Sequence, residues 1–254
     1  MKKKIQEKVL VVVAHPDDAE ISMGMKILDL KNQGHYVHVH CLSKGGKKNN
    51  NAAYKMKREY EATKAGSILN VDKYTFSDFP DTLFEKNSAE IRSELEEIIK
   101  TERPDAVYTH YHEDSHIDHE ISSKETLIAS RSVKSLVYFR SPYSRNFIPK
   151  IFYFADENSM NKKYKALKCF KSQRYLDEDF LKQISSVLYF EYLHPQLIIN
   201  LKLSHGKKIS DPLYCEFFIP ERVFEVESTL PRLKGVKKKT FEIKEKVRFS
   251  LKNS

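Results

Sequence analysis

The sequence predicts an α/β fold, Rossmann-like, with a mostly parallel sheet, helices on both faces, and a divergent C-terminal third with extra strands. Two observations predict this class. Short apolar runs alternate with segments of helical periodicity as far as about residue 140. The first run, Val9–Ala14, is apolar throughout and rich in valine, which is typical of a strand buried on both faces.

The elements of the first part follow one another at the spacing of βαβ units. We expect strands at 9–14, 36–42, 73–76, 106–109 and 136–139. Helices are expected at 21–33, with Gly34 as its end, at 52–69, and from about 119 to 130. Another helix should open at Asn87-Ser-Ala-Glu90, which resembles a capping box, and end before Pro104.

Beyond residue 141 the alternation weakens. Residues 151–154 and 214–219 look extended, and residues 160–170 and 180–192 look helical. Alternating apolar residues from Phe241 to Leu251 suggest terminal strands on a sheet edge. The chain is therefore expected to form one domain, 1–254, with a core at about 8–140 and a substrate-facing portion at about 141–254.

The composition indicates a soluble globular protein. The chain has 254 residues, of which 40% are hydrophobic and 31% charged, and no apolar run reaches membrane-spanning length. The N-terminal lysines and Val9–Ala14 lead into His15-Pro-Asp-Asp rather than into a signal cleavage site, so we expect a cytoplasmic protein. Three scattered cysteines argue against a disulfide framework or a thiolate zinc site.

The net charge of +9 does not by itself indicate a nucleic-acid partner. The excess is diffuse, and no helix-turn-helix, zinc-finger or aromatic RNA-binding signature accompanies it. Solvated basic faces explain the charge, and attraction of an anionic small-molecule substrate is the second explanation. A homo-oligomer is left open by the sequence.

Two clusters of histidines and carboxylates follow expected strands about a hundred residues apart. The first is His15-Pro-Asp17-Asp18, and the second contains His116-Ile-Asp-His119. Because parallel strands end at a common edge of the sheet, the two clusters could meet there. His15, Asp18 and His119 would then form a set of three ligands with an open fourth position, which describes a catalytic zinc.

The remaining polar residues fit acid–base roles beside such an ion. Asp17 would stay free as a general base, and His116, in its protonated form, would stabilise an oxyanion. Asp114 or Asp118 could hold an imidazole in the required tautomer. His110 and His112 are expected beside the site rather than in it.

Each cluster also has a plainer explanation. The first could be a turn in which an aspartate caps the next helix, and the second could be an exposed polar loop. Both clusters at the ends of predicted parallel strands make the metal site the better hypothesis. Three other functions stay open: a nucleotide-sugar-binding Rossmann-like module, a catalytically altered metal-binding protein, and a metal phosphoesterase. A Gly-rich phosphate loop is missing after the first strand, which counts against the first of these.

The sequence resembles the PIG-L/LmbE-like N-acetylglucosamine deacetylase family. The resemblance rests on Ala14-His-Pro-Asp-Asp with Gly24, on His116-x-Asp-His119, and on further segments at 58–69, 78–81, 104–110, 166–173 and 214–218. It implies a metal-dependent N-deacetylase that hydrolyses the acetamide of an N-acetylated amino sugar or related metabolite, with Zn²⁺ or Fe²⁺ as the ion.

Carried over to this sequence, the resemblance implies that His15, Asp18 and His119 bind the metal. Asp17 would act as the general base, His116 as the electrostatic or acid partner, and Arg58 as a substrate contact. Arg58 could instead be a surface residue paired with Glu61 on its helix. The sequence departs from the family pattern in three places. The acidic residue Glu20 comes one position later than usual, the segment after Ser22 lacks the usual pair of glycines, and Phe139-Arg-Ser-Pro142 replaces a more acidic segment. Substrate selection is expected at these places.

Overall fold

One seven-stranded sheet organises the part of the chain that the structure describes. The computed structural model describes residues 6–46, 51–173, 203, 208 and 214–223. The strand order is β3-β2-β1-β4-β5-β7-β6. The strands are β1 (Lys8–Val13), β2 (Tyr36–Cys41), β3 (Lys73–Phe76), β4 (Ala106–His110), β5 (Ser135–Phe139), β6 (Ile151–Ala155) and β7 (Tyr214–Val223).

The first five strands are parallel and the last two are antiparallel additions. β1 pairs with β2 on one side and β4 on the other, β2 pairs with β3, and β4 pairs with β5. β7 runs antiparallel to both β5 and β6, and it lies between them. The expected Rossmann-like fold with extra strands in the C-terminal part is therefore confirmed.

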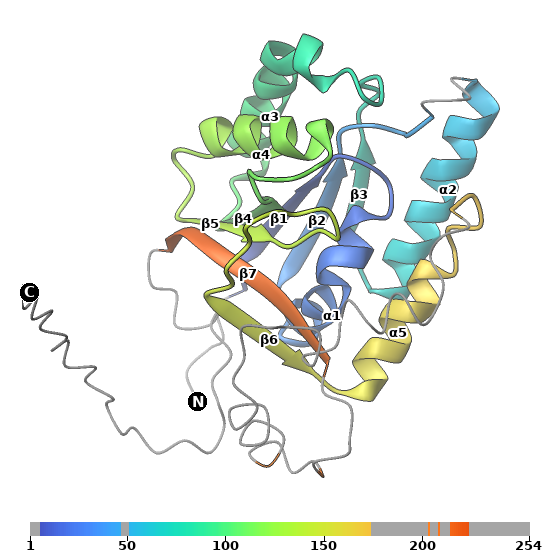
Figure 1. Cartoon of the computed structure of the whole chain (residues 1–254), viewed down its shortest axis with the longest axis vertical. Helices are drawn as coiled ribbons and strands as arrows, with labels where there is room; N and C mark the ends of the chain where they lie inside the picture. Colours follow the sequence, from blue (N-terminus) through green and yellow to red (C-terminus); the bar gives the residue numbers. More distant parts are fainter. Residues whose placement is uncertain (1–5, 47–50, 174–202, 204–207, 209–213, 224–254) are drawn as a thin grey trace, which may run out of the picture.

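In the described part of the chain, five α-helices cover the two faces of the sheet (Figure 1). They are α1 (Asp18–Asn32), α2 (Ala52–Ile68), α3 (Ser88–Glu102), α4 (Ile117–Ala129) and α5 (Glu157–Leu167). Val9, Val11 and Val13 of β1 join a core with α1, α2 and α5. Leu10 and Val12 of the same strand join a second core with α3 and α4. Both cores need an apolar face on β1, which explains its uninterrupted apolar run.

Helix α1 is broken near its middle by a contact from the far end of the chain. Met23 leaves helical geometry, with a φ of −145°. Glu216 of β7 accepts hydrogen bonds from the backbone N–H groups of Met25 (2.9 Å) and Lys26 (2.7 Å), and so caps the second half of the helix. The Nζ atom of Lys163 on α5 donates to the same carboxylate at 2.9 Å. Gly24 leaves room for this lysine, since an added Cβ would lie 3.1 Å from its Cγ.

Several sequence expectations differ from the structure in detail. Helix α1 begins at Asp18 rather than at Ile21. The capping box at Asn87 is wrong, because a 3₁₀ turn (Phe84–Asn87) precedes α3 and the Asn87 side chain donates to the Leu83 carbonyl instead. The helix expected at 180–192 and the terminal strands expected at 241–251 lie outside the described residues. Among the described helices, none is long and apolar enough to cross a membrane.

Candidate metal centre

The chemistry-bearing side chains lie where the order of the strands reverses. β1 is flanked by β2 and β4, so the chain moves outward in one direction through β2 and β3 and in the other through β4 and β5. Ligand sites of open α/β sheets occur at the carboxyl ends of strands at such a point. His15 follows β1, His110 is the last residue of β4, and His119 lies in the first turn of α4.

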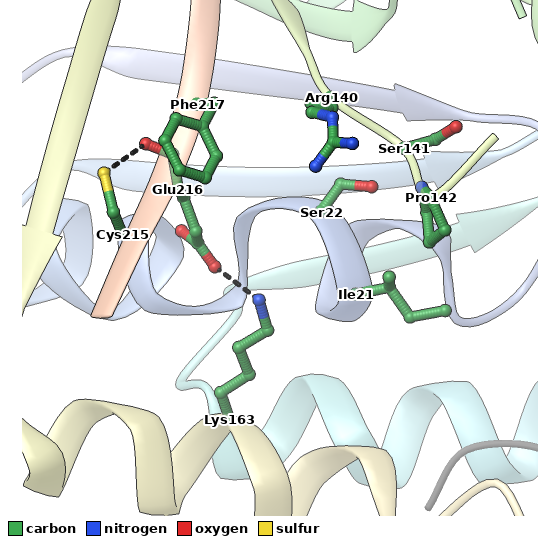
Figure 2. Close-up of a pocket in the computed structure, with 9 residues that line it drawn as sticks. All are labelled: Ile21, Ser22, Arg140, Ser141, Pro142, Lys163, Cys215, Glu216 and Phe217. Atoms are coloured by element: carbon green, nitrogen blue, oxygen red, sulfur yellow. Dashed lines mark hydrogen bonds and ion pairs between the residues drawn. The ribbon is translucent and has the colours of Figure 1, made fainter. Parts of the chain in front are cut away.

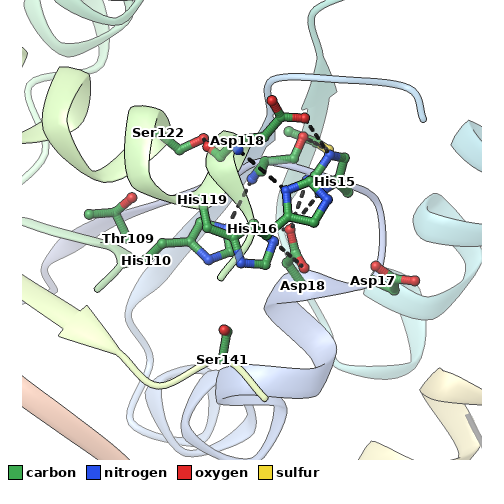
Figure 3. A network of polar contacts seen from close by, with 12 residues as sticks. His15, Asp17, Asp18, Thr109, His110, His116, Asp118, His119, Ser122 and Ser141 are labelled. Atoms are coloured by element: carbon green, nitrogen blue, oxygen red, sulfur yellow. Dashed lines mark hydrogen bonds and ion pairs between the residues drawn. The ribbon is translucent and has the colours of Figure 1, made fainter. Parts of the chain in front are cut away.

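Asp18 stands at the centre of the cluster, between two imidazole rings (Figure 3). Its Oδ2 atom lies 3.6 Å from Nδ1 of His15, and its Oδ1 atom lies 3.5 Å from Nε2 of His119. Two atoms bound to one tetrahedral zinc at about 2.0–2.2 Å are about 3.3–3.6 Å apart. The donor types and both spacings therefore fit one small divalent cation.

A carboxylate supports each of these rings from behind. Nε2 of His15 lies 3.1 Å from Oδ2 of Asp118 and 3.4 Å from Oδ1 of Asp81. Nδ1 of His119 lies 3.3 Å from Oδ1 of Asp114. Carboxylates behind imidazoles fix the tautomer of histidine ligands. The arrangement leaves Nδ1 of His15 and Nε2 of His119 facing Asp18.

Three groups of described side chains have ligand atoms within 4.8 Å of one another. They are His15 with His116 and His119; His15 with Asp81, His116 and Asp118; and Asp18 with His110 and His119. The three predicted ligands are divided between the first and third groups, with His119 common to both. None of these groups contains all three predicted ligands, so that set stays a prediction, and His116 and His110 lie beside it as neighbouring imidazoles.

The buried histidines of this cluster and the carboxylates around them shift one another's pKa values. Burial disfavours protonated His15, but hydrogen bonds to Asp118 and Asp18 outweigh it and hold its pKa well above the ordinary value. Burial also lowers the pKa of His119, but the charge of Asp18 and the hydrogen bond to Asp114 outweigh this effect and raise the pKa to about 9. Burial disfavours ionised Asp18, yet His119 and His110 keep its pKa well below its usual range. The carboxylates thus favour positive charge between them, and a metal ion would replace the protons.

Asp17 adopts a backbone conformation that non-glycine residues rarely take. Its φ is 110°, it precedes α1, and its side chain makes no capping hydrogen bond. The explanation of this residue as a helix cap is therefore wrong. Burial raises its pKa to about 6, against the opposing charge of Arg58, whose Nη2 lies 3.5 Å from Oδ2 of Asp17. Strained residues of this kind cluster at functional sites.

His116 has one ring nitrogen fixed by the start of α4. Its Nδ1 accepts a hydrogen bond of 3.3 Å from the backbone N–H of Asp118, two residues on. In the neutral ring the proton therefore belongs on Nε2. Burial and the neighbouring His15 and His119 rings lower the pKa of His116, which favours the neutral form and not the protonated form expected from the sequence. The side chain is half-buried, edge-on to His15 and stacked on His119, with ring centroids 4.7 Å away in each case.

Arg58 is buried, which rules out the surface explanation. It is 2% exposed, and its guanidinium donates to the Pro16 carbonyl at 2.5 Å as well as facing Asp17. Glu61 instead accepts hydrogen bonds from the backbone N–H and the hydroxyl of Ser172. Arg58 thus holds the turn that carries Asp17, and its expected contact with substrate stays a prediction.

Sequence reasoning expected His110 only beside the site and gave no role to Asp81. Nε2 of His110 accepts a hydrogen bond from the backbone N–H of Ala14 (3.1 Å), lies 3.3 Å from Asp18, and its ring stacks on His119 at 3.9 Å. Asp81 reaches His15 from the loop after β3. A single histidine at the end of a strand and an aspartate beside a proline carry no distinctive spacing. His112, expected beside the site, is 53% exposed at its side chain and pairs with Glu113.

Comparison with known proteins identifies the domain. Residues 10–130 match the family PIG-L, described as GlcNAc-PI de-N-acetylase. This chain carries a domain of the PIG-L family. The family resemblance expected from the sequence is confirmed, and every predicted ligand lies within the matched residues of the PIG-L domain.

Relatives extend the likeness beyond the PIG-L domain. YaiS of Escherichia coli (strain K12), named an uncharacterized deacetylase, is 28% identical over 170 residues, which span 65% of this chain and 90% of YaiS. The N,N'-diacetylchitobiose deacetylase of Pyrococcus horikoshii superposes with a TM-score of 0.63 at 22% identity, over 84% of this chain and 83% of that one. GalB, the 4-carboxy-2-hydroxymuconate hydratase of Pseudomonas putida KT2440, superposes with a TM-score of 0.65 at 22% sequence identity, over 87% of this chain and 99% of GalB. At these identities the two structures demonstrate a shared fold, which serves more than one reaction.

Proposed function

We propose that this protein is a metal-dependent N-deacetylase that hydrolyses the acetamide of an N-acetylated amino sugar or a related metabolite. One observation carries the proposal: Asp18 stands 3.5–3.6 Å from two imidazole nitrogens, each backed by a carboxylate, inside a PIG-L domain. Zinc suits this donor set, and ferrous iron is the alternative that imidazole and carboxylate also suit.

His15, Asp18 and His119 would hold the ion, through Nδ1, a carboxylate oxygen and Nε2 in turn. A bound divalent ion would supply Lewis acidity to an amide carbonyl and raise the acidity of water. The assigned role of Asp17 is to take a proton from the attacking water as its oxygen bonds to the carbonyl carbon. The buried guanidinium of Arg58 orients that carboxylate.

His116 would stabilise the oxyanion without being protonated itself. Its Nδ1 is occupied by the Asp118 backbone, so the neutral ring presents Nε2–H as a donor. The proton on Asp17 then passes to the amide nitrogen as the C–N bond breaks, because an amine leaves poorly unless it is protonated. The products are a free amine and a carboxylic acid, which releases its remaining proton to the solvent as it ionises, and Asp17 returns to its starting state.

The test combines metal analysis of the purified protein with free-amine release from a panel of N-acetylated sugars. Asp17→Asn should keep the metal and lose turnover, and His119→Ala should lose the metal itself. His116→Ala should keep the metal and release amine about 100- to 1,000-fold more slowly. His112→Ala, an exposed histidine of the same loop, is the matched control and should behave as the wild type. Amine release that persists in Asp17→Asn would remove this residue as the base.

A further inference from the structure

Helix α5 and the segment that follows it bring a later part of the chain against α2. The helix packs on α2 (Figure 1). Figure 2 shows its Lys163, which donates a hydrogen bond of 2.9 Å to Glu216 of β7. Residues 168–173 continue from the helix, and the buried ring of Phe170 lies in the same core as α1 and α2. The segment 168–173 therefore has a fixed position beside α2.

Ser172 of this segment connects two side chains of α2. Its backbone N–H donates to Oε1 of Glu61 at 3.1 Å, and its hydroxyl donates to Oε2 of the same carboxylate at 2.5 Å. The hydroxyl oxygen accepts a hydrogen bond of 3.2 Å from Nη1 of Arg58. A hydroxyl has one proton to donate and a guanidinium can only donate, so the directions of these bonds are fixed. Glu61 therefore orients the hydroxyl, and the hydroxyl holds Arg58.

The guanidinium of Arg58 links this hydroxyl to the turn before α1. Its Nη1 faces Ser172, whereas its Nη2 donates to the Pro16 carbonyl at 2.5 Å and lies 3.5 Å from Oδ2 of Asp17. A guanidinium is planar, so a hydrogen bond at one terminal nitrogen limits the directions in which the other can point. The ring of Phe170 adds a cation–π contact, with its centroid 5.8 Å from Cζ. Two residues of the segment after α5 thus contact the group that faces Asp17.

Burial makes the Ser172 hydroxyl hard to replace. Arg58, Asp17 and Glu61 are all buried, so water does not readily take the place of a lost partner. Glu61 lies three residues after Arg58 on α2, a spacing at which two helical side chains can pair directly. A guanidinium that lost the serine could therefore turn toward Glu61 and away from Asp17. The hydroxyl between them opposes this movement.

We propose that Ser172 is a positioning residue for the base: its hydroxyl, oriented by Glu61, keeps the Arg58 guanidinium directed at the turn that carries Asp17. The inference rests on the proposed deacetylase function, because the direction of Asp17 matters only if that carboxylate takes a proton from the attacking water. In this role Ser172 acts through Arg58 and contacts neither the substrate nor the metal. A residue outside the matched range 10–130 then contributes to turnover.

The experiment measures kcat and KM for amine release from the N-acetylated sugar that the wild type hydrolyses fastest. Ser172→Ala should lower kcat about 10-fold and change KM less than about twofold, because the hydroxyl affects the chemical step and not the binding of substrate. Ser172→Thr keeps the hydroxyl and should restore most of kcat. Ser67→Ala removes an exposed hydroxyl of the same helix, bonded to the Thr63 carbonyl, and should leave both constants unchanged.

A double-mutant cycle tests whether Ser172 acts through Arg58. Arg58→Met removes the guanidinium, so in this background Ser172→Ala should change kcat less than about twofold. An undiminished loss of kcat in that background overturns the proposal. So does a Ser172→Ala variant with unchanged kcat, with a lower metal content than the wild type, or with a kcat that Ser172→Thr does not restore.

Hydrogen exchange separates this inference from the proposed function. If the wild type releases amine from no sugar of the panel, the deacetylase assignment fails, and Ser172 is judged from exchange of the backbone amides of residues 15–21. The N–H groups of Asp18 and Ile21 are hydrogen-bonded within this turn, and Ser172→Ala should accelerate their exchange but not that of β4. Unchanged exchange at residues 15–21 overturns the positioning role. Equal acceleration in both segments also overturns it, because it indicates a general loss of stability.

Discussion

Replacing Glu216 by glutamine tests whether the broken helix α1 depends on a strand from the far end of the chain. Glu216 is 3% exposed and Lys163 is 1% exposed, so the ion pair between them is almost fully removed from water. One carboxylate oxygen accepts from Met25 and Lys163, and the other accepts from Lys26. A glutamine oxygen can keep the first two bonds, but its NH₂ group would then face the Lys26 N–H.

The expected loss follows from stripping one partner from a buried ion pair. Such a change typically costs about 3–5 kcal/mol, because the remaining charge stays buried and uncompensated. For a chain of this size that corresponds to a fall in Tm of about 6–20 °C. Urea unfolding of the full chain, followed by circular dichroism, measures the change in free energy of unfolding.

A double-mutant cycle with Lys163→Met sharpens this test. Removing both partners leaves no lone charge, so the double variant should be less destabilised than the sum of the two single variants, by about 1–3 kcal/mol. Lys162→Met, on an exposed position of the same helix, is the control and should change stability little. A loss below about 1 kcal/mol in Glu216→Gln, or strict additivity in the cycle, would refute the reasoning.

Two further predictions concern the metal centre and a buried histidine of β2. Asp114→Asn removes the charge behind His119 and should weaken zinc binding about 10- to 100-fold in a chelator competition titration. Asp105→Asn, an equal change of charge at a half-buried aspartate paired with Lys134, should not weaken it. Burial, followed by the charge of His40, lowers the pKa of His38 from 6.5 to about 4. Between pH 6.5 and about pH 4, His38 is protonated in the unfolded chain and neutral in the native protein. The free energy of unfolding should therefore fall as the pH falls through this range. The urea midpoints at pH 7 and pH 5 should differ less in His38→Gln than in the wild type; an equal difference would contradict the assignment.

The sequence predicted the parts of this molecule that local patterns determine. The valine-rich run of β1 faces a core on each side of the sheet, so its pattern alone indicates a central parallel strand. The two histidine clusters each follow such a strand, and the rule that parallel strands end at one edge was enough to bring His15 within reach of His119. Their ring centroids are 5.6 Å apart.

The features that were missed depend on contacts between distant segments. The break at Met23 is matched by a carboxylate more than 190 positions later, and no pattern near residue 23 reports it. The place of β7 between β5 and β6 is likewise set by long-range pairing. Arg58 has the surroundings of an exposed helical residue in the sequence, yet the turn at Pro16 buries its guanidinium. Local periodicity carries no signal for such contacts.

The insertion of β7 makes the order of assembly differ from the order of synthesis. A nascent chain that ends before Tyr214 already contains every expected metal ligand, but β6 then has no neighbouring strand and the second half of α1 has no cap. The residues proposed to bind the cation are thus translated well before the strand that holds Glu216. Loss of the last described strand should leave those residues in the chain and deprive the second half of α1 and the edge of β6 of their partners.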